Sequence, residues 1–247
     1  MTHSVETSGQ TLTKRYRSWS RDEPVREWTA LTLLTRTAPG LAPVPLELSP
    51  GDSPWLTMTV VPGSPLQGSL TAEQLGAVGD ALETLWSVPS EELPAIDLPA
   101  LVERTRSGLR ALCDGDDVIG VAARAWLDDE SPDLTPIDDP VVAHGDPNLA
   151  NYLWDGDRVR IVDFEDAGRG DRAIELANLV EHLSWRQTDP TSLVRRFAVD
   201  PDRFRAARCL WAGFWLMLIG PGGPSAARNP PGTAQAQARR VLRLVAG

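Results

Sequence analysis

The sequence predicts an α+β protein with a small strand-rich lobe followed by a larger, mainly helical lobe. Four short segments of alternating β-branched and apolar residues lie in the first 62 positions, whereas apolar residues at helical spacing dominate the rest. Pro62-Gly63-Ser64-Pro65 ends the last strong strand of the first part sharply. We therefore expect two domains, 1–62 and 63–247, in a chain whose 247 residues are enough to bury a sizeable core.

The strands of the first lobe are indicated by alternation and by turn residues. Residues 3–7 and 11–16 alternate on either side of Ser8-Gly9, which is a hairpin signal. A further strand is expected at 44–48, inside a Pro/Gly-rich stretch. The strongest strand signal of the lobe is 55–61.

One helix is expected between these strands, over residues 23–35. Asp22 precedes it and is a candidate N-cap, because a short acidic side chain can accept from the first free backbone N–H groups. The apolar residues that should share its buried face are Val25, Trp28, Leu31 and Leu34.

The second lobe is expected to be mostly helical. Thr71 and Gln74 form a capping-box pattern at its first helix, and Asp171 is placed to cap a later helix or to tie down the loop before it. The expected helices are 71–88, 98–113, 118–127, 172–185, 192–197, 201–219 and 234–245, and the expected strands are 141–143, 152–154 and 159–162.

Composition excludes several classes of function. The formal net charge is −10 and no basic run of useful length is present, which argues against a nucleic-acid partner. The longest apolar stretch, 210–219, is too short to span a membrane, and the polar N-terminal segment is not a secretory signal. Cys113 and Cys209 have no metal-ligand spacing and are expected to be buried free thiols, which favours a cytoplasmic location. The sequence does not predict the oligomeric state.

Lys14 is the single lysine among 24 basic residues. A chain that uses arginine almost everywhere keeps a lysine by chance, or keeps it where a compact ammonium on a flexible stem is required. The strand position of Lys14 gives the second interpretation its weight.

Residues 141–179 carry the pattern that phosphoryl transfer requires. A strand leads to His144-Gly145-Asp146, Asn151 follows, and a hairpin leads to Asp163. Phosphoryl transfer needs a carboxylate that orients or deprotonates the attacking hydroxyl, and oxygen ligands that hold Mg²⁺ against the nucleotide phosphates. Asp146 fits the first task, and the amide of Asn151 and the carboxylate of Asp163 fit the second.

These motifs resemble a known family. His144-Gly145-Asp146-Pro147-Asn148-Leu149-Ala150-Asn151 resembles the H-G-D-x-x-x-x-N loop of the aminoglycoside phosphotransferase and choline kinase family. Val162-Asp163-Phe164-Glu165 resembles its metal-binding segment, and Gly170-Asp171-Arg172-Ala173-Ile174-Glu175-Leu176-Ala177 resembles the helix start that follows. The resemblance implies a protein-kinase-like two-lobed fold, with ATP or GTP as co-substrate and a small-molecule hydroxyl as acceptor.

The resemblance also implies roles for the motif residues. Asp146 would be the catalytic base or would orient the hydroxyl, and Asn151 and Asp163 would be the Mg²⁺ ligands. His144 would brace the loop by hydrogen bonding, since the reaction needs one base. Glu165 would approach a second metal, support the metal ligands or lie on the surface.

The nucleotide side of the site is expected in the first lobe. Lys14 lies thirteen residues before Glu27, which resembles the strand lysine and helix glutamate of kinases. Glu27 could equally be a solvated helix residue. The segment that contains Met58, Thr59 and Val61 resembles the family's linker strand, whose backbone would pair with adenine.

The short connection between Asp163 and Asp171 bears on the acceptor. Seven residues lie between them, which leaves no room for the long activation segment of a protein kinase, so a small-molecule acceptor is expected. The acidic residues that would suit a cationic acceptor, such as an aminoglycoside antibiotic, are Asp155, Asp157, Asp166 and Glu181. The tryptophans that either pack in the core or line the acceptor pocket are Trp185, Trp211 and Trp215.

The segment before Lys14 leaves a second function open. It contains one glycine, Gly9, and no G-x-G-x-x-G loop to cover the phosphates, so the nucleotide-binding lobe is expected to be short. A kinase-like binding or regulatory protein without turnover is therefore the alternative to a small-molecule kinase.

Overall fold

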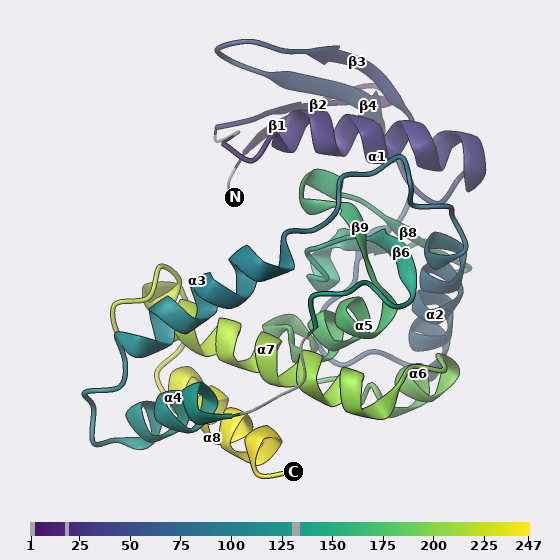
Figure 1. Cartoon of the computed structure of the whole chain (residues 1–247). Helices are drawn as coiled ribbons and strands as arrows, with labels where there is room; N and C mark the ends of the chain where they lie inside the picture. The colour runs from purple at the N-terminus through teal and green to yellow at the C-terminus, as the bar shows by residue number, and fades with distance from the viewer. Residues whose placement is uncertain (1–2, 18–19, 130–133) are drawn as a thin grey trace.

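The computed structural model describes residues 3–17, 20–129 and 134–247. It has the expected mixed architecture, with a small lobe at the top of Figure 1 and a larger helical lobe below it. The elements of the small lobe are β1 (Ser4–Ser8), β2 (Thr11–Arg15), α1 (Glu23–Thr37), β3 (Pro45–Ser49) and β4 (Trp55–Thr59). The strands form one antiparallel sheet in the order β1-β2-β4-β3, and α1 lies between this sheet and the larger lobe (Figure 1).

The two faces of this sheet differ because side chains alternate along each strand. Lys14 pairs with Leu56 across β2 and β4, and both side chains are buried on the face toward α1. Thr13 pairs with Thr57 on the opposite face, where their hydroxyl oxygens lie 3.0 Å apart in a hydrogen bond. The lysine therefore points inward from a sheet whose outer face is polar.

Helix α1 differs from expectation at its start and on its buried face. Asp22 has a left-handed backbone (φ 58°) and its side chain makes no capping hydrogen bond, so the predicted N-cap is wrong. Val25 is about half exposed, whereas Glu27 and Ala30 are buried. The helix is rotated from the purely apolar expectation because the Glu27 carboxylate is turned inward to Lys14.

The larger lobe contains the expected helices and, among the described residues, two small sheets, β5-β7-β8 and β6-β9. Its helices are α2 (Ala72–Trp86), α3 (Leu98–Arg110), α4 (Val118–Asp128), α5 (Arg172–Glu181), α6 (Thr191–Arg196), α7 (Pro201–Ile219) and α8 (Thr233–Val245). Its strands are β5 (Ser64–Pro65), β6 (Pro140–Ala143), β7 (Tyr152–Trp154), β8 (Val159–Ile161) and β9 (Gly168–Asp171). Its short 3₁₀ helices are η1 (Leu149–Asn151), η2 (Phe164–Asp166), η3 (Leu183–Trp185) and η4 (Ala226–Arg228).

Local sequence signals explain several of these boundaries. The capping box at α2 forms as predicted, with Thr71 accepting from the Gln74 backbone and the Gln74 side chain accepting in return. Strand β9 was not predicted; it pairs antiparallel with β6 and brings Asp171 back beside Pro140. The predicted helix 172–185 is too long, because α5 ends at Glu181 and a separate 3₁₀ turn follows.

Two apolar clusters hold the molecule together. One runs from the small lobe into the larger one, and includes Leu34, Leu56, Val78, Leu85 and Phe164. The other packs α3, α4, α7 and α8 into the arm at the lower left of Figure 1. The first cluster crosses between the lobes, so apolar packing helps to fix the position of the small-lobe sheet relative to the larger lobe.

Both cysteines are free thiols as predicted, although Cys113 is only partly buried. Among the described residues, no helix combines the length and the apolar character that crossing a membrane requires.

Candidate active site

Gly145 lets the loop after β6 pass close to η2. Its φ is +83°, a conformation that favours glycine, and a Cβ placed there would lie 2.5 Å from the backbone oxygen of Asp166. A side chain at this position would separate the loop that carries Asp146 from the segment that carries Asp163.

His144 uses both ring nitrogens to hold this loop. Its Nδ1 accepts from the Asp146 backbone N–H at 3.3 Å, so the ring proton is on Nε2, which donates to the Val162 carbonyl oxygen at 2.9 Å. The side chain is buried. His144 therefore has the contacts of a brace between the loop and the strand that leads to Asp163.

Helix α5 supplies two further contacts that the sequence did not reveal. The Glu175 carboxylate accepts from the backbone N–H groups of His144 (3.0 Å) and Gly145 (3.4 Å). Asn178, one turn later on the same face, donates to the Gly145 carbonyl at 3.1 Å. Burial raises the pKa of Glu175. The signal that could have indicated them is two polar residues, three apart, in an otherwise apolar buried helix.

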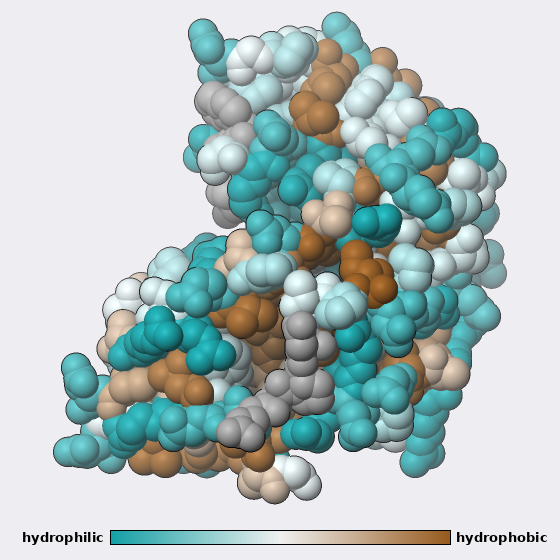
Figure 2. All heavy atoms as spheres, viewed as in Figure 1, coloured by the Kyte–Doolittle hydropathy of each residue, from teal (hydrophilic) through white to brown (hydrophobic). Residues whose placement is uncertain are grey.

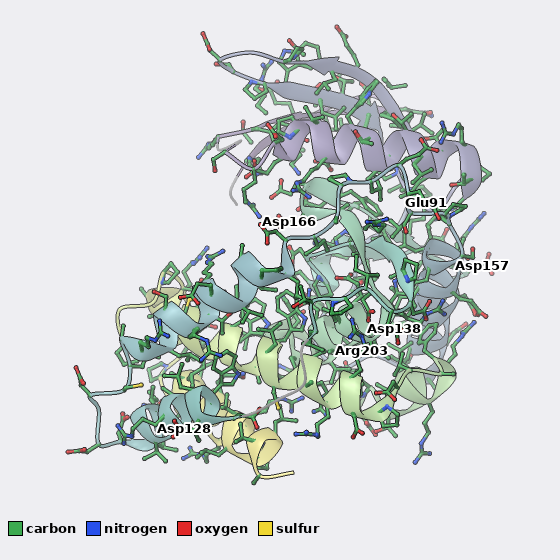
Figure 3. All side chains as sticks on the ribbon, viewed as in Figure 1. Glu91, Asp128, Asp138, Asp157, Asp166 and Arg203 are labelled. Atoms are coloured by element: carbon green, nitrogen blue, oxygen red, sulfur yellow. The ribbon has the colours of Figure 1, made fainter. Side chains whose placement is uncertain are left out.

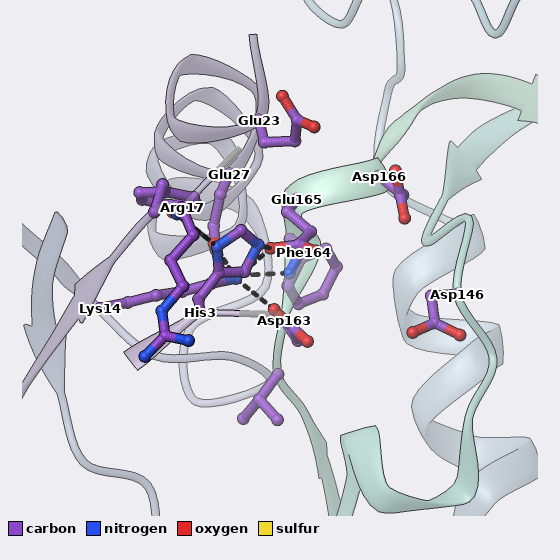
Figure 4. Close-up of polar contacts among 12 residues, drawn as sticks. His3, Lys14, Arg17, Glu23, Glu27, Asp146, Asp163, Phe164, Glu165 and Asp166 are labelled. Atoms are coloured by element: carbon purple, nitrogen blue, oxygen red, sulfur yellow. Dashed lines mark hydrogen bonds and ion pairs between the residues drawn. The ribbon is translucent and has the colours of Figure 1, made fainter. Parts of the chain in front are cut away.

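Asp146 lies at the tip of the loop with its carboxylate directed across the site. The Asn151 side-chain N–H group donates to the Asp146 backbone oxygen at 3.0 Å and to its Oδ2 at 3.2 Å. Burial raises the pKa of Asp146, an effect that His144 opposes and that the carboxylates of Asp166 and Asp163 reinforce. Figure 4 shows the carboxylates of Asp146 and Asp163 on facing sides of the site.

Lys14 is the centre of the opposite side. Its ammonium lies 2.7 Å from Glu27 and 2.6 Å from Glu165, and it also pairs with Asp163 (Figure 4). Burial alone would lower the pKa of Lys14, but the three carboxylates together raise it, so the side chain stays charged.

Glu27 is buried, and both of its carboxylate oxygens accept hydrogen bonds. Besides Lys14 it accepts from the Tyr16 hydroxyl at 2.5 Å and from the Phe164 backbone N–H at 3.2 Å. Burial and the Glu27 carboxylate raise the pKa of Tyr16. The structure thus rules out the solvated position for Glu27 and adds Tyr16, which the sequence reading missed, to the contacts that hold it.

Asp163 and Glu165 flank the Lys14 ammonium from the larger lobe. Asp163 has a left-handed backbone (φ 70°), a strained conformation for a non-glycine residue, and its side chain is 39% exposed. Glu165 pairs with His3 at 2.8 Å as well as with Lys14. Glu165 is therefore not a surface residue, and His3 is a further contact that was not predicted.

The donor set fits a magnesium ion. One ammonium faces three carboxylates, which leaves an excess of negative charge, and the carboxylate oxygens of Glu27, Asp163 and Glu165 lie within 4.8 Å of one another. The Asn151 amide nitrogen is occupied by Asp146, so its oxygen is the atom left for a metal. Carboxylate and amide oxygens are the ligands that Mg²⁺ prefers.

An ion pair joins the lobes at the edge of this site. Arg21, just before α1, pairs with Asp166 on η2, and Arg26 donates to the Ala167 carbonyl oxygen at 3.2 Å. Figure 2 shows the surface notched between the small lobe and the α3–α4 arm, and Asp166 lies at this notch in Figure 3.

Asp171 caps α5 and also anchors the preceding segment. Its carboxylate accepts from the backbone N–H groups of Ala173 and Ile174, and from Asp138 and Arg203. Burial alone would raise the pKa of Asp171, but these donors lower it.

The four acidic residues predicted to attract a cationic acceptor do not lie together. Asp155 pairs with Arg160 and, like Asp157, belongs to the β7–β8 turn, which is distant from the notch in Figure 3. Glu181 is buried, and its carboxylate pairs with Arg208 and Arg240. Asp166 alone of the four lies at the site, so that part of the prediction is wrong.

The tryptophans divide in the same way. Trp185 is buried and donates to the Pro147 carbonyl at 2.8 Å, and Trp211 is buried and donates to the Ile174 carbonyl at 3.1 Å. Both are core residues, which is the first of the two positions predicted for them. Trp215 is partly exposed and packs edge-on against His182.

The predicted linker strand is β4 and the segment after it. Met58 is buried in the apolar cluster that runs between the lobes. The N–H of Thr59 donates to the Val44 oxygen at 2.9 Å and that of Val60 to the Gln10 oxygen at 2.8 Å. The N–H of Val61 has no partner among the described residues.

Comparison with known proteins gives this geometry a family. A search of curated protein sequences finds no match. The chain is similar in structure to a choline/ethanolamine kinase family protein from Mesorhizobium loti, at 19% identity and a TM-score of 0.66, covering 100% of this chain and 85% of that one. It is similar to aminoglycoside 2'-phosphotransferase-IIIa in its GDP complex (15%, 0.63, 99% and 88%) and to choline kinase LicA from Streptococcus pneumoniae (11%, 0.62, 99% and 89%). These likenesses show a protein-kinase-like fold. The sequence pattern of the phosphotransferase enzyme family matches residues 5–210, and the chain belongs to that family.

Proposed function

We propose that this chain transfers the γ-phosphoryl group of ATP or GTP to a hydroxyl group of a small molecule. The observation that supports this most directly is the pairing of Lys14 with Glu27 and Asp163 on one side of the site, with Asp146 facing them from the other. Phosphoryl transfer depends on positioning and charge, and these four side chains supply both.

Each side chain then has one task. Lys14 holds the α- and β-phosphates, and Glu27 keeps the ammonium in place. Asp163 and the oxygen of Asn151 would hold Mg²⁺, which when bound neutralises charge on the phosphates. Asp146 orients the acceptor hydroxyl and accepts its proton as the new bond to phosphorus forms.

The adenine or guanine base is proposed to pair with the backbone after β4. The carbonyl of Thr59 and the unpartnered N–H of Val61 offer an acceptor and a donor two residues apart. Met58 closes the back of this pocket with its buried side chain.

The acceptor is proposed to carry an amine as well as a hydroxyl. The structural relatives are kinases described as acting on choline, ethanolamine or aminoglycosides. In this chain, Asp146, Asp163 and Asp166 place three carboxylates around the same site, and Asp166 reaches the notch in the surface. Carboxylates in a recess raise the local concentration of cationic ligands. We further propose a cytoplasmic location, where nucleotide, Mg²⁺ and reduced thiols are present together.

A thermal-shift titration tests the nucleotide half of this proposal. ATP and GTP, each with Mg²⁺, are expected to raise the melting temperature, because a ligand that binds only the folded state stabilises it. Transfer of labelled phosphate from the better nucleotide to choline, ethanolamine and a panel of aminoglycosides then tests the acceptor. A shift without transfer to any hydroxyl compound would support the alternative, a kinase-like binding protein. The absence of a shift with either nucleotide would overturn the nucleotide-binding role.

A further inference from the structure

We infer that His182 is a positioning residue for Asp146. Helix α5 ends at Glu181, and His182 has an extended backbone (φ −62°, ψ 139°) before η3 begins. This break directs the buried imidazole toward the loop, where its Nε2 lies 3.6 Å from Oδ1 of Asp146. A continuous helix, which the apolar spacing predicted, would carry the ring elsewhere.

The hydrogen bonds of His182 fix which nitrogen carries the proton. Its Nδ1 accepts from the Ser184 backbone N–H at 3.1 Å and lies 2.7 Å from the Ser184 hydroxyl oxygen. That hydroxyl oxygen accepts from the Leu149 backbone N–H at 3.0 Å, so its own proton is free to point at Nδ1. With Nδ1 acting as acceptor, the ring proton is on Nε2 and faces the Asp146 carboxylate.

The ring also stays uncharged. Burial, reinforced by the neighbouring guanidinium of Arg186, lowers the pKa of His182 to about 3. Asp146 is the acidic group that faces the ring, and the edge-on indole of Trp215, 4.6 Å away between ring centroids, covers it. A neutral Nε2–H can donate toward Asp146 but cannot take over its role as base at neutral pH.

The backbone around His182 is held against the catalytic loop at two more points. Trp185 donates to the Pro147 carbonyl oxygen at 2.8 Å, and Ser184 accepts from Leu149. The turn therefore contacts the loop through three of its four residues, at Asp146, Pro147 and Leu149.

Arginine side chains also bind the backbone immediately before this turn. Arg186 donates to the Glu181 carbonyl oxygen at 2.7 Å and Arg240 to the Val180 carbonyl oxygen at 3.4 Å, so the last carbonyls of α5 have side-chain partners. Arg208 and Arg240, from α7 and α8, also hold the buried Glu181 carboxylate. The position of His182 is thus fixed independently of Asp146.

The result is a carboxylate with a side-chain N–H beside each of its oxygens, bonded at Oδ2 and 3.6 Å away at Oδ1. Asn151 donates to Oδ2 of Asp146, and His182 presents its N–H to Oδ1. This inference rests on the proposed role of Asp146 as the group that orients the acceptor hydroxyl. A fixed carboxylate plane sets the direction from which that hydroxyl is held.

The contact itself can be read without turnover. The chain has three histidines, so long-range ¹H–¹⁵N correlation spectra of the ¹⁵N-labelled full chain resolve each ring, and His182→Gln assigns the signal. We expect His182 to keep the neutral Nε2–H pattern from pH 5 to 8, and its Nε2 signal to move in Asp146→Asn. A ring that titrates in this range, or an Nε2 signal unaffected by Asp146→Asn, would overturn the inference.

Two substitutions then test positioning by rate. His182→Leu removes the donor and His182→Gln retains a side-chain N–H. Each variant is assayed at the same interval below its own melting temperature, so that the comparison of rates does not reflect a difference in stability. With ATP and Mg²⁺, and water or an identified hydroxyl compound as acceptor, His182→Leu should lower kcat roughly tenfold with KM for ATP unchanged. His182→Gln should recover most of that loss. Equal kcat in the wild type and His182→Leu would overturn the inference and leave the kinase proposal standing. A wild type without turnover would count against the kinase proposal, and the spectra alone would then decide the contact.

Discussion

Lys14 and Asp163 are 149 positions apart in the sequence and form an ion pair across the two lobes. The pair includes a strand residue that faces inward and a carboxylate on a strained backbone. Glu27 and Glu165 contact the same ammonium, so Lys14 is held by carboxylates from both lobes. The phosphates of the proposed nucleotide substrate would therefore meet an ammonium whose position is already fixed.

Replacing Lys14 by Arg tests whether a compact ammonium is required. The guanidinium is planar and bulkier, so we expect it to displace Glu27 and to weaken nucleotide binding at least about tenfold, although the charge is kept. Isothermal titration calorimetry with Mg²⁺-ATP measures this. Arg15→Lys, at the exposed neighbouring position on the other face of β2, is the matched control and should bind normally. Normal binding by Lys14→Arg would show that nucleotide binding does not require a lysine at this position, and that the single lysine was kept by chance.

Asp146→Ala should remove the proposed base while leaving the nucleotide site intact. We expect turnover to fall by about 10²–10⁴-fold, the usual range for a positioned general base. Nucleotide affinity, measured by calorimetry, should be little changed. Asp157→Ala removes a carboxylate from an exposed turn and serves as the control for loss of charge. Turnover close to that of the wild type in Asp146→Ala would take this residue out of the mechanism.

Asp163→Asn distinguishes metal binding from phosphate binding. The amide cannot supply the anionic ligand that Mg²⁺ favours, so the increase in nucleotide affinity that Mg²⁺ produces should be largely lost. Binding is compared with Mg²⁺ and with a chelator, for the wild type and the variant. An equal effect of Mg²⁺ on both proteins would contradict the ligand assignment.

Tyr16→Phe should destabilise the fold more than loss of a surface hydroxyl would. The Tyr16 hydroxyl donates to the buried Glu27 carboxylate, and loss of a hydrogen bond to a charged group costs about 1.5–3 kcal/mol. The free energy of unfolding in urea measures the effect. Thr11→Val, which removes an exposed hydroxyl at the start of the preceding strand β2, should cost much less. Similar costs for the two variants would show that Glu27 does not depend on Tyr16.

The lowered pKa of Asp171 predicts how the free energy of unfolding depends on pH. Its donors hold its folded pKa below the unfolded value of about 3.9, so its stabilising contribution is present above that value and is lost as the pH falls through the folded pKa. Asp171→Asn should lower the free energy of unfolding at pH 7 by roughly 2–4 kcal/mol, because Arg203 loses its buried partner. The difference from the wild type should shrink as the pH falls below the unfolded value. A difference that is constant from pH 7 to pH 2 would exclude this linkage.

The sequence allowed prediction of the part of the site that is local along the chain. Asp146, Asn151 and Asp163 lie on one strand-loop-hairpin unit, so their spacing alone indicated the chemistry. Lys14 and Glu27 could be proposed because one is the only lysine and the other follows at kinase spacing. The role of His3 depends on a contact with an element distant in sequence, and a single chain carries no pattern that signals it. Glu175 stands out only as a polar residue in an apolar helix, and its partners on the loop after β6 could not be predicted.

The end of α5 shows a different limit of sequence reasoning. The apolar spacing continues through Trp185, and no proline or glycine interrupts it. The helix ends because the His182 ring takes the Ser184 N–H and distant arginines take the last helical carbonyls. Helical periodicity describes what a segment can form alone and is overridden where side chains from elsewhere bind its backbone.

The single lysine has a practical consequence for following this protein in solution. An amine-reactive reagent can acylate only the α-amino group and Lys14, and the lysine is buried and held protonated by its carboxylate partners. Acylation of Lys14 therefore requires the lobes to part. The acylated fraction is measured from the mass increase of the peptide that contains Lys14. The labelling rate measures how often the cleft opens, and a compound that slows it either keeps the two lobes together or covers Lys14 itself.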